Sequence, residues 1–221
     1  MLTKDTFKFL GELKKHNERP WFEKNKARYE SQVRDPMLDL VAALQPRLRQ
    51  ITRHVVVDPR SVMRIYRDVR FSKDKSPYKT YLAAMFWHSD GKESPSPGYY
   101  LHVEPGGKTM LGGGVWRPEG AALKRIRDAI AGDAAGWKKV TSGLLKGGAC
   151  SMIGESLKRP PPGYDPEHPL IEDLKRKDFC VSMPFGDAKV VSARFADEVG
   201  KGAEKMAPLM KFLAGAVGAD F

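Results

Sequence analysis

Residues 81–115 read YLAAMFWHSDGKESPSPGYYLHVEPGGKTMLGGGV. Three runs of apolar and β-prone residues lie within this stretch, at 81–87, 99–103 and 109–115. The Gly-, Ser- and Pro-rich residues 89–98 separate the first two runs, and Pro105-Gly106-Gly107 forms a tight turn before the third. Parallel neighbours need a crossover of about a dozen residues or more, so connections this short predict an antiparallel meander.

The residues just upstream also alternate with a period of two. Met63, Ile65, Val69 and Phe71 fall on one side of an extended segment, and polar or charged residues fall on the other. Turn-forming residues follow at 72–77. We therefore predict a further strand over residues 63–71.

The beginning of the chain has a helical period instead. Apolar residues recur every three or four positions in three segments, and each segment starts with a residue suited to a helix N-terminus. Thr3 caps the first, Pro20 suits the first turn of the second, and Asp35-Pro36 predicts a cap followed by a first-turn proline in the third. These features predict a helical N-terminal layer over about residues 3–52.

The remainder of the chain is predicted to be mostly helix and loop. Pro118 begins a helix, whereas the five prolines in residues 158–169 exclude a regular helix or a central strand there. Residues 178–184 predict one more strand, and residues 192–217 predict a long helix that Pro208 kinks or divides.

Together these segments predict an α+β fold. We expect a mainly antiparallel sheet of four to six strands over about residues 61–116, with N-terminal and C-terminal helices packed on it. The chain has 221 residues and is 41% apolar, which is enough to bury a core and excludes the disordered class. No internal repeat or long low-complexity linker is present, so we expect a single domain over residues 1–221.

Three features indicate a cytoplasmic protein that does not insert into membranes. The longest apolar run, residues 82–87, is six residues long, far short of the roughly 20 that span a bilayer. The N-terminus shows no apolar export signal with a cleavage site. Cys150 and Cys180 lie far apart in a chain without secretory features, so we expect reduced, packed thiols.

Positive charge is concentrated in the first third of the chain. The formal net charge is +11, and the first 80 residues hold 19 of the 38 Lys and Arg but only 10 of the 27 Asp and Glu. An excess of this kind indicates an anionic partner, such as a phosphometabolite, a nucleic acid or an acidic protein surface.

The densest charged segment runs from Arg60 to Lys79 and contains seven basic and two acidic residues. Guanidinium groups bind phosphate or carboxylate through paired hydrogen bonds, and lysine adds a mobile charge. On the predicted strand, Asp68 would orient a neighbouring arginine while the arginines hold an anion, and the loop residues would close over it. The predicted ligand-binding residues are Arg64, Arg67, Asp68, Arg70, Lys75, Tyr78 and Lys79.

Two other interpretations of this segment stay open. Mixed charges usually form an ion-pair network on a solvated sheet face. Arginines interspersed with Tyr66, Phe71 and Tyr78 also suit phosphate contact and base stacking, although Asp68 and Asp74 are poorly placed for a continuous phosphate track.

The same segment carries a resemblance to a known family. Arg64, Arg67, Asp68, Arg70 and Phe71, followed by Asp74-Lys75 and Tyr78, form an Arg-x-x-Arg-Asp-x-Arg-Phe motif with a downstream Asp-Lys and Tyr. With this motif, and over most of its length, the chain closely resembles a family of bacterial and fungal proteins catalogued as domain of unknown function 2461. The resemblance implies no particular activity, substrate or catalytic residue.

His102 and Glu104 are the candidate acid–base residues. On a regular strand they share one face with Tyr100, so they could act as a base with its orienting carboxylate or as two metal ligands. A third ligand would have to come from elsewhere, for instance Asp165 or His168, and a hydrogen-bonded strand histidine is the more ordinary outcome. We therefore predict no metal and no cofactor.

Other motifs add little chemistry. Residues 112–118, GGGVWRP, could hold an anion at a helix N-terminus, but strand glycines more often mark a bulge or close backbone packing. The chain contains no G-x-S-x-G elbow, P-loop or H-E-x-x-H motif.

The leading functional hypothesis is binding of a small anionic or phosphorylated ligand, with or without turnover, in a cleft walled by the arginine segment. One alternative is a nucleic-acid-associated protein that uses the basic N-terminal third. Another is a structural or interaction domain without a ligand.

Overall fold

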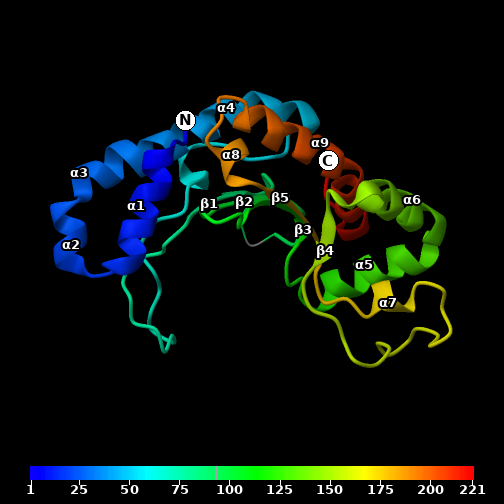
Figure 1. The fold of residues 1–221 in the computed structure, drawn as a ribbon. Helices are drawn as coiled ribbons and strands as arrows, with labels where there is room; N and C mark the ends of the chain where they lie inside the picture. The colour runs from blue at the N-terminus through cyan, green and yellow to red at the C-terminus, as the bar shows by residue number, and fades with distance from the viewer. Residues whose placement is uncertain (93) are drawn as a thin grey trace.

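The computed structural model describes residues 1–92 and 94–221 (Figure 1). In this part of the chain, five antiparallel strands form one sheet with the order β1-β2-β3-β5-β4. The strands are β1 (Leu82–Phe86), β2 (Gly98–Val103), β3 (Thr109–Val115), β4 (Ser151–Ile153) and β5 (Phe179–Phe185). The predicted α+β fold and its antiparallel meander are confirmed.

The N-terminal helices are α1 (Lys4–Lys15), α2 (Arg19–Lys24), α3 (Lys26–Tyr29) and α4 (Asp35–Ile51), with a π-helical turn η1 (Glu30–Arg34) before α4. Thr3 caps α1 in a capping box with Thr6, as its position predicted. The prediction that Asp35 caps a separate helix is wrong. Residue Arg34 is already helical, so α4 continues directly from η1 and Asp35 pairs with Arg34 instead.

The other helical elements are η2 (Pro59–Ser61), α5 (Gly120–Gly132), α6 (Ala134–Leu145), η3 (Lys146–Gly148), α7 (Ile171–Leu174), α8 (Asp187–Val190) and α9 (Phe195–Val217). Helix α5 starts at Gly120, two residues later than predicted from Pro118. Helix α9 passes through Pro208 as one helix, so the proline does not divide it. The proline-rich residues 158–169 form a loop, as expected.

Helices α4 and α9 lie together across one face of the sheet (Figure 1). Side chains on this face alternate along each strand and are buried, including Phe86 on β1, Leu101 on β2 and Val181 on β5. Gly113 on β3 allows α9 to approach closely, because a Cβ at this position would lie 2.9 Å from Met206 Sδ. The glycine run therefore serves backbone packing, in agreement with the more ordinary of its two interpretations.

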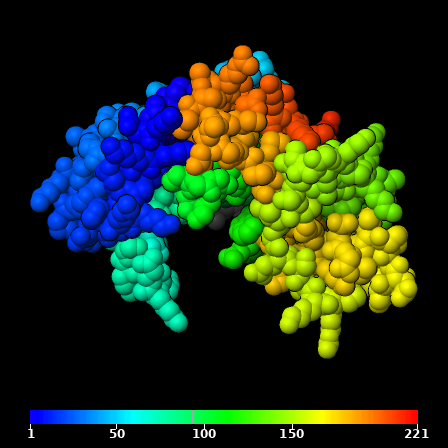
Figure 2. All heavy atoms as spheres, viewed as in Figure 1, coloured from blue at the N-terminus to red at the C-terminus, as the bar shows by residue number. Residues whose placement is uncertain are grey.

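The opposite face of the sheet carries partly exposed side chains. Met85, Tyr100, His102 and Met110 occupy this face, because they alternate with the buried residues of β1, β2 and β3. Figure 2 shows a hollow beneath this face, between the teal segment around residue 70 and the yellow-green residues near 158. We refer to it as the hollow.

The predicted strand over residues 63–71 is wrong. These residues form one arm of an irregular hairpin, residues 64–79, that projects from the sheet beside β1 (Figure 1). Single bridges join Val62 to Ala84 and Tyr66 to Tyr78. The side-chain carboxylates of Asp68 and Asp74 accept hydrogen bonds from backbone N–H groups two residues later, which competes with a regular ladder.

Candidate functional site: a basic groove beside the arginine hairpin

The arginine hairpin, residues 64–79, is anchored at its base. The Asn17 side-chain amide donates to the Tyr78 carbonyl at 2.9 Å and accepts from the Tyr78 N–H at 3.0 Å. The Tyr78 ring is buried and stacks on Phe22 with the ring centroids 4.1 Å apart. The predicted ligand residue Tyr78 thus joins the hairpin to the core of the N-terminal layer.

Arg67 lies between the two arms of the hairpin. Its Nη1 donates to the carboxylate of Asp74 and to the hydroxyl of Ser76, whereas its Nη2 makes only a long 3.5 Å contact with Ser72 Oγ. The hydrogen bond from Arg67 is the main reason that the pKa of Asp74 falls well below its usual range. Arg67 is therefore held in one orientation with donor capacity to spare.

Arg70 and Asp68 form an exposed pair further out on the hairpin. Arg70 Nε lies 3.0 Å from Asp68 Oδ1 and Nη2 lies 2.7 Å from Oδ2, a bidentate arrangement. These hydrogen bonds lower the pKa of Asp68 to about 2. Asp68 therefore pairs with Arg70, and its role in a ligand site stays a prediction.

Two lysines of the hairpin contact backbone oxygens. Lys75 Nζ donates to the Val69 carbonyl at 2.9 Å, and Lys79 Nζ donates to the Arg64 carbonyl at 3.0 Å. Burial and the neighbouring Arg64 guanidinium lower the pKa of Lys79. Within residues 1–92 and 94–221, neither Arg64, Lys75 nor Lys79 forms an ion pair with a carboxylate. Two adjacent cations, Arg64 and Lys79, thus lack a counter-charge there.

A groove of about 500 Å³ runs along the base of the hairpin. It is large enough for a small ligand and opens to solvent. The residues that line it are Lys14, Asn17, Arg67, Asp68, Asp74, Ser76, Tyr78, Lys79, Thr80 and Tyr81. We call this feature the basic groove. Four of the seven predicted ligand residues line it, whereas Arg64, Arg70 and Lys75 do not.

Tyr81 connects the basic groove to the predicted acid–base pair. Its ring lies against His102 with the centroids 4.5 Å apart. His102 Nε2 lies 3.1 Å from Glu104 Oε2, and Nδ1 lies 3.4 Å from the Tyr100 hydroxyl. The candidate base and its orienting carboxylate are therefore assembled on the uncovered side of β2.

Glu104 is held as a carboxylate by two donors. Its side chain is 19% exposed and also accepts from Lys108 Nζ at 3.1 Å. Burial opposes ionisation, but the hydrogen bonds from His102 and Lys108 outweigh it and lower the pKa of Glu104. An ionised Glu104 fixes a proton on His102 Nε2 and leaves Nδ1 facing Tyr100.

The structure brings no third metal ligand to His102 and Glu104. Asp165 and His168 accept backbone N–H groups within their own loop. Across the described residues, no group of three His, Cys, Asp or Glu side chains could hold a metal ion. His102 and Glu104 form a hydrogen-bonded histidine–carboxylate pair.

Both cysteines are buried and unpaired in the described structure. Burial raises the pKa of the Cys180 thiol to about 12 and also raises that of Cys150.

The backbone after the glycine run does not offer a free donor at Arg117. The Arg117 N–H donates to the buried carboxylate of Asp178 at 2.9 Å, so this backbone donor is already occupied.

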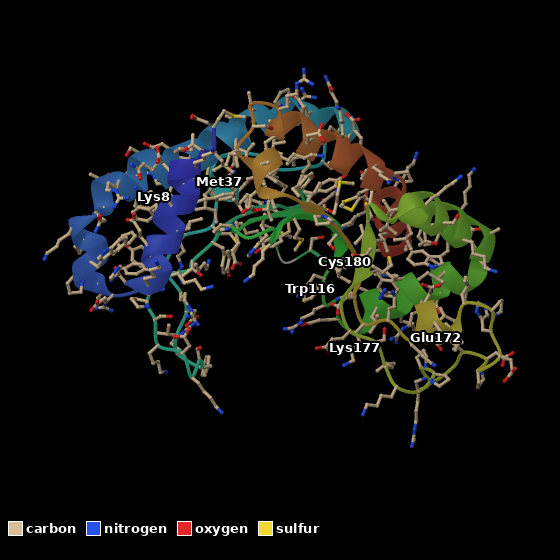
Figure 3. The ribbon with its side chains drawn as sticks, viewed as in Figure 1. Lys8, Met37, Trp116, Glu172, Lys177 and Cys180 are labelled. Carbon is tan, nitrogen blue, oxygen red and sulfur yellow. The ribbon has the colours of Figure 1, made fainter. Side chains whose placement is uncertain are left out.

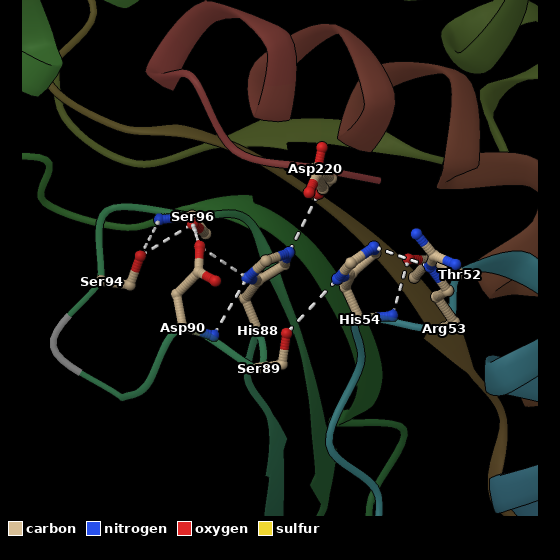
Figure 4. Close-up of polar contacts among 9 residues, drawn as sticks. All are labelled: Thr52, Arg53, His54, His88, Ser89, Asp90, Ser94, Ser96 and Asp220. Atoms are coloured by element: carbon tan, nitrogen blue, oxygen red, sulfur yellow. Dashed lines mark hydrogen bonds and ion pairs between the residues drawn. The ribbon is translucent and has the colours of Figure 1, made fainter.

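A second polar cluster holds the segment after α9 against the sheet (Figure 4). The buried His88 ring lies with Nε2 2.9 Å from the Asp220 carbonyl and Nδ1 3.0 Å from the Asp90 carboxylate. His54 stacks on it at a centroid distance of 5.3 Å. Both ring nitrogens of His88 have partners, so this cluster anchors the chain.

Sequence reasoning did not single out Lys14, Asn17 and Tyr81 as part of the site. Lys14 lies in the last turn of α1 and Asn17 just after this helix, about 50 residues before the hairpin, and no spacing links them to it. The only available signal was charge, because Lys14 lies in the basic N-terminal third.

These features define a class of α+β protein with helices on one face of an antiparallel sheet and a charged hairpin beside its first strand. The family model for the conserved hypothetical proteins DUF2461 matches residues 5–212, so the chain belongs to this family. Searches of curated proteins and of solved structures found no significant match. Of the helices in residues 1–92 and 94–221, none combines the length and the apolar character of a membrane span.

Proposed function

We propose that the basic groove binds a small anionic ligand that carries a phosphate or carboxylate group. The observation that carries the proposal is the pair of adjacent cations, Arg64 and Lys79, which have no carboxylate partner in the described residues and of which Lys79 lines the groove. Like charges brought together without a counter-charge repel each other, and a bound anion would offset that cost.

Arg67 supplies the directional part of the site. Asp74 and Ser76 hold its Nη1, and its Nη2 makes only a long contact with Ser72, so this nitrogen retains capacity to donate to a ligand. A guanidinium fixed in this way loses little conformational entropy when it binds an anion. Lys14 also lines the groove, so its lining holds three cations, whereas its two carboxylates, Asp68 and Asp74, are each paired with an arginine.

The ion-pair interpretation accounts for part of the hairpin only. It explains the Arg67–Asp74 and Arg70–Asp68 pairs, which are the expected arrangement of mixed surface charges. It does not account for the partly buried, unpaired Lys79 next to Arg64 at a groove of about 500 Å³. These two features favour a ligand.

Turnover of the bound ligand would use His102. Tyr81 lines the groove and contacts the His102 ring, and Glu104 orients the same ring from its other side. In the proposal His102 acts as the general acid or base and Glu104 as the positioning residue.

Isothermal titration with pyrophosphate tests the proposal. Lys79→Met should weaken binding about tenfold or more, because a charge-assisted hydrogen bond contributes about 1.5–3 kcal/mol. Lys73→Met is the matched control, since Lys73 is an exposed lysine of the same hairpin that does not line the groove. Its affinity should stay within about twofold of wild type.

Two results would count against the groove. Equal losses in the two variants would indicate diffuse electrostatic attraction, and no binding by the wild type would leave the hairpin as a structural ion-pair network. The salt dependence of the affinity separates the groove from the nucleic-acid alternative. For a site with one or two phosphate contacts the affinity falls only slightly as the salt concentration rises, whereas for nucleic acid bound along the basic helices it falls steeply.

A further inference from the structure

Two exposed aromatic side chains, each beside an arginine, lie on segments that flank the hollow. Phe71 is 96% exposed on the arginine hairpin, with the Arg70 guanidinium 5.9 Å from its ring centroid. Trp116 is 55% exposed just beyond β3, with the Arg117 guanidinium 5.7 Å from its ring centroid. Figure 3 shows Trp116 at the edge of the hollow opposite the hairpin.

Exposed aromatic residues of this size need an explanation, because burying such a ring normally stabilises a protein. The other large exposed apolar side chains in the described residues, apart from Met1, are Met63, Tyr66 and Met85. Met63 and Tyr66 lie on or next to the hairpin, and Met85 lies on the uncovered face of β1. Met85 adds exposed apolar surface on the sheet face above the hollow, beside the segments that carry Phe71 and Trp116, and this combination indicates an interaction surface.

The charges around the hollow select an anionic partner. The hairpin contains Arg64, Arg67, Arg70, Lys73, Lys75 and Lys79, and its two carboxylates, Asp68 and Asp74, are each paired with an arginine. On the other side, Arg117, Lys158 and Arg159 are exposed. Positive charge combined with exposed rings on two sides of a hollow is complementary to a chain of phosphates that also carries flat bases.

We infer that the hollow binds single-stranded nucleic acid, with bases stacked on Phe71 and Trp116 and one phosphate of the strand in the basic groove. This inference rests on the proposed function, since it names the class of phosphate compound that the groove accepts. It adds a part of the surface, the two aromatic–arginine pairs, that a small anion would not contact.

A double helix fits these features less well. Stacking on Phe71 and Trp116 requires bases that are unpaired and turned toward the protein, and a duplex hides its base faces. The acidic residues of the hairpin also interrupt a long phosphate track, whereas a single strand can follow the unpaired cations.

Fluorescence anisotropy with two labelled single-stranded oligonucleotides, each ten nucleotides long, tests the inference. One strand is oligo(dT) and the other has the same phosphate backbone without bases. The wild type should bind oligo(dT) about tenfold or more tightly than the abasic strand, because stacking contributes about 1–3 kcal/mol per base. Phe71→Ala and Trp116→Ala should each remove most of this difference and leave affinity for the abasic strand unchanged.

Met63→Ala is the matched control. Met63 is 43% exposed and lies next to the hairpin, but it has no flat ring on which a base can stack. The Met63→Ala variant should therefore prefer oligo(dT) as strongly as the wild type does. Equal wild-type affinity for the two strands would overturn the inference, as would a Phe71→Ala variant that keeps the full preference. Because Phe71 is exposed, we expect the Phe71→Ala variant to fold normally, and its circular dichroism spectrum should match that of the wild type.

Failure of the two proposals can be told apart. If Lys79→Met binds both strands and pyrophosphate like the wild type while Phe71→Ala loses the oligo(dT) preference, the groove proposal fails but the stacking surface stands. If pyrophosphate binding depends on Lys79 and oligo(dT) binds no better than the abasic strand, the groove stands and its ligand is a different phosphate or carboxylate compound.

Discussion

The side chain of Asn17 hydrogen-bonds both the N–H and the carbonyl of Tyr78, at 3.0 and 2.9 Å. These two bonds join the segment just after α1 to the base of the arginine hairpin, 61 residues later in the chain. The contact sets the position of Lys79 next to Tyr78 and hence one wall of the basic groove.

We expect Asn17→Ala to lower the free energy of unfolding by about 1–3 kcal/mol, because it leaves two partly buried backbone groups without partners. Urea denaturation followed by circular dichroism measures the change. Gln50→Ala replaces an exposed amide and should stay within about 0.5 kcal/mol of wild type. A similar change in unfolding free energy in both variants would show that the two hydrogen bonds between Asn17 and Tyr78 do not stabilise the protein.

Gly114 should tolerate no side chain. Its φ is +140°, and a Cβ would lie 2.1 Å from the Phe179 carbonyl oxygen on the neighbouring strand. We expect Gly114→Ala to lower the unfolding free energy by about 3 kcal/mol or more, the upper range for backbone strain with a backbone clash. Thermal unfolding monitored by circular dichroism measures it.

Gly11→Ala is the opposite control for this prediction. Gly11 lies inside α1 with nothing within 4 Å of an added Cβ, so the alanine should stabilise the protein by about 0.5–1 kcal/mol. A neutral Gly114→Ala variant would contradict the packing described for β3 and β5, and a destabilised Gly11→Ala variant would contradict the open space at Gly11 on α1.

The Asp68–Arg70 pair predicts a specific pH response. The Arg70 hydrogen bonds lower the pKa of Asp68 to about 2, below the value of an unfolded chain. The pair therefore contributes stability above about pH 4, and this contribution is lost as the pH falls toward 2. Carboxyl ¹³C NMR should place the Asp68 midpoint near pH 2 in the wild type.

Arg70→Gln should move the Asp68 midpoint up toward the ordinary value. Asp58, whose pKa is lowered by Arg60, should keep its low midpoint in the same variant and serves as the internal control. An Asp68 midpoint unaffected by the loss of Arg70 would show that the pair does not persist in solution.

The thiols should be unreactive in the folded protein. Cys150 and Cys180 are buried, and burial raises the pKa of both. Because the thiolate is the reactive form, we expect slow modification by a disulfide reagent at pH 8 and fast modification of both cysteines in denaturant. Rapid reaction of either thiol without denaturant would contradict its burial.

The sequence by itself determined the elements that depend on local signals. Period and cap residues predicted α1 from Thr3, and short turns predicted the meander of β1, β2 and β3. The strand at Phe179–Phe185 and the long helix Phe195–Val217 followed from their apolar patterns. In each case the backbone conformation is decided by neighbours within a few residues, which a sequence shows directly.

Local pattern misled at residues 63–71, where alternation predicted a strand. Only tertiary structure decides whether an alternating segment pairs with a sheet, and here the Asx turns at Asp68 and Asp74 and the absent N–H of Pro77 favour an irregular hairpin. The short strand β4 was not predicted, since three residues carry too weak a pattern.

The site divides in the same way. The sequence identified the charged motif and the His102–Glu104 pair, because residues on one strand or one turn lie close together whatever the rest of the chain does. Only the tertiary structure determined that Lys14 and Asn17 join Lys79 at one groove, and that Lys79 has no carboxylate partner among the described residues. These contacts join segments that are distant in sequence, and the packing of α1 against the hairpin brings them together.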